Sequence, residues 1–391
     1  MFLHHLPINQ LFIDPFSEYI KHYDLMDITC SKFRNQRDPK LFDNRLFIVN
    51  SETTDRAQLA KAVDFLASRK VKVLGIDLLF DSLNNDSSDT LLHHALSHSK
   101  NTILAYTFQE NEIDEISKIR NRSDSFFVGS NVQYYVNLAS DDAYTVRSFE
   151  PFHSVDSFPS KAFSVGISEL YKPEILKEIE NRNSKKEWIN FRRGHFVVLN
   201  EQGSEEPRTF INYPIVPISK FLKDSSLYDS VYFKDKIVLI GFCGEDPESF
   251  SLKDRFFTPL NEKPSGRSFP DMHGVIIHAN IISMLLDHDY IDEIPPYILH
   301  LIAFLIFFIN YFIFLRVINA KLLFTLFFIR IIQFVEFLLL LTLSIWLLAN
   351  FNLKIGFVYM VTSIIISFEL FEFYTHKLQY RVLRLLNKLI D

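Results

Sequence analysis

Four aspartates occupy positions where a sheet protein commonly binds its ligands. Asp77 and Asp81 stand at and just beyond the end of one short apolar run, and Asp246 and Asp254 follow a second run. Ligands of open α/β sheets bind outside the carboxyl ends of the strands, so these carboxylates can meet at one edge. We expect a pocket there for a polar or cationic ligand, with oxygen ligands that also suit a metal ion. The alternative is structural, because a buried carboxylate such as Asp77 can accept backbone N–H groups and fix a loop.

Arg147 is the basic residue that we expect to complete this ligand site. It lies in the segment YTVRSF, inside a short apolar stretch. A bidentate pair with one of the four carboxylates would join two loops. We favour this structural pairing over the capture of a ligand by Arg147.

The sequence offers little for catalysis or for a metal. His273 and His278 are five residues apart, which does not place them on one face of a helix, and no Cys/His cluster suggests zinc. There is no G-x-S-x-G motif, and 10 glycines in the whole chain argue against a phosphate-binding loop. We therefore assign no catalytic residue, no metal and no cofactor, and we predict that the chain is not an enzyme. A hydrolase that uses Asp77 and Asp81 stays a third option, although the sequence shows no motif that would position a nucleophile.

Ionisable residues also occur in the apolar C-terminal part, where they are costly unless they face a protein partner. Our hypothesis is a clamp in which Arg330 pairs with Glu369 or Glu372, with Glu336 nearby. The alternative is that all four side chains extend to the membrane interface.

Alternating helical and strand patterns must position these residues. The segment from Asp55 to Ser82 has apolar residues at helical spacing and then a nearly continuous apolar run, which is typical of a strand covered on both faces. Similar patterns predict strands at 45–49, 101–108 and 236–241, a helix capped by Asp89, and helices at 161–171 and 274–286. We expect a surface loop or short helix at 109–125 and a hairpin within 129–146. The fold class is α/β, with a mainly parallel sheet flanked by helices.

Three spanning segments are predicted at the C-terminus, at about 297–315, 331–350 and 355–375. Basic residues gather in the turn after the first segment and in the amphipathic tail 376–391, whereas the opposite flanks are acidic. The positive-inside rule then places that turn and the C-terminus in the cytoplasm and the soluble domain outside. Because an external domain needs an export signal and residues 1–40 contain none, we expect a transmembrane helix upstream of the sequence. The alternative is that the domain is cytoplasmic and that the charge bias is misleading.

Composition limits the remaining classes. The formal charge of −6 over 391 residues does not indicate a protein that binds nucleic acid. Cys30 and Cys243 are far apart in sequence, and whether they form a disulfide is left open.

Eight motifs in order give the chain a family resemblance over about residues 40–290. They are DRAQLA with VKVLGIDLLFD, DTLLHHAL, Arg147 in YTVRSF, Pro159-Ser160, INYP, KDKIVLIG, DRFFTP and HGVIIHANIISMLL. In this order they resemble the CHASE sensor domain of the second type, an extracytoplasmic domain found beside bacterial cyclases and histidine kinases. The resemblance implies a sensor domain at 41–293 between an N-terminal transmembrane helix and the three-helix region 297–375. Within this sequence, only residues 376–391 follow the third segment, and they are too few for the cyclase, kinase or phosphatase module that is usual in the family.

The resulting prediction is a multi-pass protein of the bacterial inner membrane with a periplasmic or extracellular domain. It would pass a ligand- or partner-dependent signal to a separate cytoplasmic protein, with the lipid bilayer, a protein partner and a second copy of the chain as contacts. The alternative is a structural subunit of an envelope complex.

Overall fold

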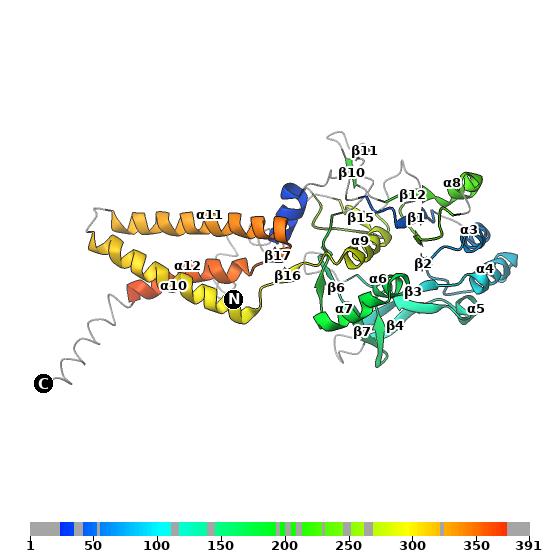
Figure 1. Cartoon of the computed structure of the whole chain (residues 1–391), viewed down its shortest axis with the longest axis horizontal. Coiled ribbons are helices and arrows are strands. Elements are labelled where there is room, and N and C mark those ends of the chain that lie inside the picture. The colour runs from blue at the N-terminus through cyan, green and yellow to red at the C-terminus, as the bar shows by residue number, and fades with distance from the viewer. Residues whose placement is uncertain are drawn as a thin grey trace, which may run out of the picture. The chain divides into compact units, whose positions relative to one another are not determined.

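The computed structural model describes residues 24–34, 42–52, 55–110, 117–138, 145–192, 196–199, 205–208, 213–228, 231–244, 252–261, 269–320 and 324–373. The chain divides into two compact units, Met1–Tyr290 and Ile291–Asp391. We call them the sheet unit and the helical unit, and Figure 1 labels many of the elements of both.

Parallel strands form the centre of the sheet unit, as the apolar runs predict. Their order is β12 (Ile215–Pro217), β1 (Leu46–Asn50), β13 (Ile237–Gly241), β2 (Val73–Asp77) and β3 (Thr102–Glu110). All four pairings are parallel, so the carboxyl ends of these strands share one edge. β13 comes late in the chain yet lies between β1 and β2, which places Gly241 opposite Asp77.

The far side of the sheet differs from the sequence prediction. The segment 109–125, predicted as a loop or short helix, contains β4 (Ser117–Arg122), which pairs antiparallel with β3. The hairpin predicted within 129–146 is wrong, because β5 (Val132–Tyr135) pairs parallel with β3 instead. β7 (Phe152–Val155) and β8 (Phe158–Lys161) complete this side. Such peripheral strands need few apolar residues, so their pattern is weak.

Helices cover both faces of the sheet (Figure 1). Residues on one face of the central strands, such as Leu74 and Ile76 of β2, share an apolar core with α3 (Arg56–Ser68), α4 (Ser87–His98) and α8 (Ile218–Lys223). The opposite face contacts α6 (Phe163–Tyr171) and α9 (Gly274–Asp287). A Cβ on Gly75 would lie 2.5 Å from Ile167 of α6, so this contact requires glycine.

The cap of α4 corrects a further detail. Asp86, rather than Asp89, accepts the backbone N–H groups at its start. Short elements connect the layers of the sheet unit: α2 (Leu25–Ile28), the π-helical turn Thr29–Phe33, α5 (Ser125–Val128), β6 (Ser148–Phe149), α7 (Glu174–Arg182), β9 (Glu187–Trp188), β10 (Phe196–Leu199), β11 (Glu205–Arg208), the 3₁₀ turn Ser225–Leu227, β14 (Arg255–Phe256) and β15 (Met272–His273).

The helical unit contains α10 (Pro296–Asn319), α11 (Thr325–Phe351) and α12 (Phe357–Phe373). Among the described residues, two helices are long and apolar enough to cross a membrane, α10 and α11, with mean hydropathies of 2.5 and 2.2. The prediction of three spanning segments is therefore corrected to two. α12 follows a turn and β17 (Leu353–Lys354), and its 17 described residues extend to Phe373, the last residue that the structure describes.

α10 and α12 run in the same direction. β17 pairs parallel with β16 (Asp292–Glu293), which brings the starts of the two helices together. Near their other ends, the ring of Phe314 contacts those of Phe368 and Phe371. α11 therefore runs antiparallel to both helices.

Candidate functional site

The structure brings Asp77 and Asp254 together at the carboxyl edge of the sheet. Alternation along β2 directs Asp77 toward the α9 face, opposite to Leu74 and Ile76. Asp254 stands just before β14 with a left-handed φ of 53°, and its backbone oxygen accepts the N–H of Gly274 at 3.1 Å. The two carboxylate oxygens of Asp254 lie 3.1 Å from the point that a Cβ on Gly274 would occupy. Asp254 therefore lies against the first residue of α9, where the partial positive charge of a helix favours a carboxylate.

Both carboxyl groups hold protons more tightly than free aspartate. Burial, and then the charge of Asp254, raises the pKa of Asp77 to about 8. Burial also raises the pKa of Asp254 to about 6, although a hydrogen bond from the Gly274 backbone and the charge of Lys253 oppose the rise. Asp254 keeps more contact with solvent than Asp77, which accords with its smaller shift. The two carboxyl groups interact through their charges, but they offer no activated nucleophile.

Cys243 lies in the same electrostatic environment. Burial, followed by the charges of Asp254 and Asp77, raises the pKa of its thiol. Cys243 and Cys30 are both free thiols, so the two cysteines do not form the disulfide that the sequence left open.

A pocket of about 300 Å³ opens at the same edge, on the α3 side of the sheet. Ser51 and Glu52 line it after β1, and Leu78 to Phe80 line it after β2. Arg56 and Leu59 come from the first turns of α3, and Lys253 comes from the segment before β14. Three separate parts of the chain therefore converge on one cavity.

The segment Lys253-Asp254 connects this pocket with α9. Lys253 lines the pocket, with its ammonium 5.0 Å from the centre of the Phe242 ring. The next residue, Asp254, lies against Gly274 at the start of α9. The two residues are adjacent in sequence, so one short segment contacts both the pocket and the start of α9.

The other predicted members of this site lie elsewhere. Asp81 is exposed and accepts a hydrogen bond from the hydroxyl of Ser82 at 3.2 Å, so it does not join Asp77. Asp246 lies outside the described residues. The separation of Asp81 from Asp77 removes the pair that the hydrolase option required.

The expected pairing of Arg147 with these carboxylates is wrong. Arg147 binds Asp27 of α2 instead, with Nε 2.9 Å from Oδ1 and Nη2 2.6 Å from Oδ2. The side chain of Asp27 is completely buried and that of Arg147 nearly so. Burial raises the pKa of Asp27, and the bonds from Arg147 oppose that rise. No sequence pattern indicates this pair, because its members are 120 residues apart.

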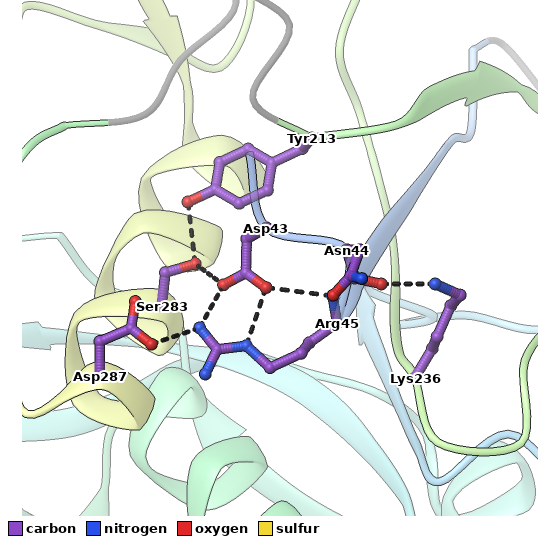
Figure 2. Close-up of polar contacts among 7 residues, drawn as sticks. All are labelled: Asp43, Asn44, Arg45, Tyr213, Lys236, Ser283 and Asp287. Carbon is purple, nitrogen blue, oxygen red and sulfur yellow. Dashed lines mark hydrogen bonds and ion pairs between the residues drawn. The ribbon is translucent and has the colours of Figure 1, made fainter. Parts of the chain in front are cut away.

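A polar network at the opposite, amino edge of the sheet was not foreseen (Figure 2). Arg45 donates to Asp43 from Nε at 2.8 Å and from Nη2 at 2.6 Å, and Nη2 also donates to Asp287 at 2.6 Å. Ser283 donates to Asp43 at 2.8 Å, and the hydroxyl of Tyr213 lies 3.1 Å from that of Ser283. We call these five residues the Asp43 network.

The Asp43 network fastens the end of α9 to the start of β1. Ser283 and Asp287 belong to the last two turns of α9, whereas Asp43 and Arg45 directly precede β1. Burial alone would raise the pKa of Asp43, but its bonds with Arg45 and Ser283 outweigh burial and lower it. The carboxylate therefore stays charged, and α9 is held at both edges of the sheet.

In the helical unit, Arg330 of α11 lies 3.4 Å from Glu369 of α12. The Arg330 guanidinium also donates to Gln333 at 3.0 Å and lies 4.4 Å from the centre of the Phe368 ring. Glu336 faces Asn310 of α10 and is separate from this pair, and the side chain of Glu372 is exposed. The structure thus joins two of the four residues in the clamp hypothesis.

Comparison with known proteins identifies the family of the chain. Searches of curated proteins and of solved structures find no match. The family model of the CHASE2 domain matches residues 40–317, which is more than half of the chain. This match confirms the resemblance that the ordered motifs predicted, and it extends from the sheet unit into α10. The chain therefore belongs to the CHASE2 domain family, a family of sensory extracellular domains.

Proposed function

We propose that this chain is a membrane-anchored sensor whose sheet unit lies outside the cytoplasm. A change at the carboxyl edge of the sheet passes through α9 to the helical unit, where a separate cytoplasmic protein detects it. The observation that carries this proposal is the path of α9. The helix starts against Asp254, ends in the Asp43 network, and is followed by residues 288–295 and then α10. The sensory character of the CHASE2 family supports the same function.

Charge distribution supports the orientation. α10 and α11 are consecutive antiparallel helices. Arg316 lies in the last turn of α10, Lys321 lies between the two helices in sequence, and Arg330 lies in the second turn of α11. The segment before α10 carries Asp287, Asp289, Asp292 and Glu293. The positive-inside rule favours the turn on the cytoplasmic side of a bacterial inner membrane.

A signal requires two arrangements of the helical unit, because a ligand can only shift an equilibrium between states for which it has different affinities. The contacts of Arg330 with Glu369 and Phe368 join α11 to α12 and are few and partly exposed. Such contacts can be exchanged at small cost. We propose that displacement of α10 by α9 changes this packing.

Cysteine labelling tests the orientation. In a chain without Cys30 and Cys243, a single cysteine replaces Lys185, which is exposed in the sheet unit, or Ala320, which is exposed at the end of α10. A membrane-impermeant maleimide should label position 185 in intact spheroplasts and position 320 only after lysis. Labelling of position 320 with protection of position 185 would overturn the proposed orientation.

Cross-linking tests the transmission. Leu299 of α10 and Met360 of α12 share one apolar cluster, so cysteines at both positions report the packing of the two helices. Arg45→Met breaks the Asp43 network and should change the rate of disulfide formation several-fold, whereas Arg120→Met, at an exposed position of β4, should not. Equal rates in all three chains would argue for a structural subunit of an envelope complex.

A further inference from the structure

Three buried polar atoms of the helical unit lie where α10 faces α11. They are Oδ1 and Nδ2 of Asn310 and Oε2 of Glu336, and none has a hydrogen-bond partner of good geometry among the described residues. Asn310 is completely buried, and Glu336 is partly buried and faces it. Buried polar atoms normally have partners, so these three atoms require an explanation.

Both residues lie well inside their helices. Asn310 precedes the end of α10 at Asn319 by nine residues, and Glu336 follows the start of α11 at Thr325 by eleven. At about 1.5 Å per residue, these separations correspond to roughly 14 and 17 Å, which is about half of a hydrocarbon layer of about 30 Å. In helices that span a membrane, the two side chains therefore lie near the centre of the bilayer.

No cation among the described residues of the three helices offsets a charge on Glu336. Apart from tyrosines, the other titratable or charged side chains of these helices are His300 and Arg316 of α10, Arg330 of α11, and Glu369 and Glu372 of α12. Arg330 pairs with Glu369, whereas His300, Arg316 and Glu372 are exposed. Asn310 is the one polar side chain in the described part of the chain that interacts with Glu336. An ionised Glu336 would thus be an uncompensated charge in an apolar environment, which is a costly state.

One proton supplies what the three atoms lack. A carboxylate only accepts hydrogen bonds, so an ionised Glu336 leaves the amide oxygen of Asn310 without a donor. A protonated Glu336 can donate from Oε2 to Oδ1 of Asn310, while Nδ2 of Asn310 donates to Oε1 of Glu336. This ring of two hydrogen bonds gives all three atoms a partner at once.

We propose that Glu336 and Asn310 form a proton-binding site within the membrane, in which the neutral carboxyl group of Glu336 joins α11 to α10. Release of the proton to water breaks the bond to Oδ1 of Asn310 and leaves a charge in the bilayer. Proton binding is thereby coupled to the packing of α10 against α11. The inference rests on the membrane anchoring in the proposed function and adds a ligand to its helical unit.

A metal cation fits the same position less well. Among the described residues, no group of three or more His, Cys, Asp or Glu side chains could hold a metal ion. A cation between Glu336 and Asn310 would also leave Nδ2 of Asn310 without an acceptor, because the carboxylate would be turned toward the cation. A sodium ion is therefore the competing occupant that the experiment has to distinguish from a proton.

Infrared spectroscopy of the full chain in lipid nanodiscs at pH 7.5 tests the protonation state, because a free glutamate is ionised at that pH. The difference spectrum between the natural chain and Glu336→Gln should contain the carbonyl band of one protonated carboxylic acid. Glutamine can form the same two-bond ring with Asn310, so this variant should unfold at the same temperature as the natural chain. Glu293→Gln, at an exposed glutamate of β16, is the control and should lose no such band.

A second variant and a change of salt identify the partner and the occupant. Asn310→Leu should shift the band to higher frequency, because the carboxyl group loses both hydrogen bonds. Exchange of choline for sodium in the buffer should leave the band unchanged. Absence of the band from the Glu336→Gln difference spectrum, an unshifted band in folded Asn310→Leu, or loss of the band in sodium overturns the inference. Any of these results with correct cysteine labelling at positions 185 and 320 would leave the proposed orientation standing and remove only the proton site.

Discussion

The buried pair of Arg147 and Asp27 allows a quantitative test of its structural role. Arg147→Met keeps most of the length of the side chain but leaves the Asp27 carboxylate buried without its cation. Removal of one partner of a buried ion pair costs about 3–5 kcal/mol. At about 2 °C per kcal/mol for a large domain, the melting temperature of the sheet unit should fall by about 6–10 °C.

The assay is thermal unfolding of the full chain in detergent, followed by circular dichroism. The double variant Arg147→Met with Asp27→Asn should recover much of the loss, because it buries no charge. Arg120→Met is the matched control, since Arg120 is exposed on β4, and it should change the melting temperature by about 1 °C or less.

Two results would refute the reasoning. A fall of less than about 2 °C for Arg147→Met would mean that Asp27 does not depend on Arg147. A large fall without recovery in the double variant would mean that the arginine acts through packing and not through its charge.

Three further predictions concern other parts of the chain. The folded-state pKa of Asp77 is about 8, above its ordinary value of 3.8, so the stability it contributes is complete below pH 3.8 and is lost as pH rises toward 8. Asp77→Asn should therefore raise the melting temperature at pH 8 and change it little at pH 4.5, and equal shifts at both pH values would contradict the shifted pKa. Gly166→Ala would place a Cβ 2.2 Å from the Tyr134 ring and should destabilise the sheet unit by about 1–3 kcal/mol in chemical denaturation, whereas a neutral result would contradict this contact. Arg330→Ala should destabilise the helical unit by about 1–2 kcal/mol, because it removes an exposed ion pair with Glu369 and a cation–π contact, and unchanged unfolding in detergent would mean that Arg330 does not clamp the helices.

The central strands could be predicted because the types of their residues indicate that both faces are buried. The runs around β2 and β13 are nearly continuous in Val, Ile and Leu, which is typical of parallel strands covered on both faces. Their position next to each other could not be predicted, because nothing local in sequence specifies that β13 inserts between β1 and β2. β4 was missed for a different reason, since its exposed position at the side of the sheet requires only one half-buried apolar residue, Ile119.

The candidate site could likewise be predicted only in part from the sequence. The rule that ligands bind at the carboxyl edge is enough to anticipate Asp77 near Asp254, because both follow parallel strands. The same rule misplaces Asp81, since it describes where strands end but not where a loop turns outward. Asp27 and Asp287 were missed because their partners are 120 and 242 residues away, and a charged residue has no sequence periodicity that reveals a distant partner.

The arrangement of charges along α9 links the site to the proposed function. At its start, the Asp254 carboxyl group has a pKa of about 6, so its charge responds readily to a nearby ammonium or proton. At its end, the pKa of Asp43 is lowered, and Arg45 bridges Asp43 and Asp287. The charge at the start of α9 can therefore change, whereas the end of α9 is fixed to the sheet. In sequence, the end of α9 is followed by β16 and then α10. Because close-packed interiors transmit strain, we expect a change at Asp254 to reach the Asp43 network through α9. The proposed sensor therefore requires motion of α9 and of the Lys253-Asp254 segment.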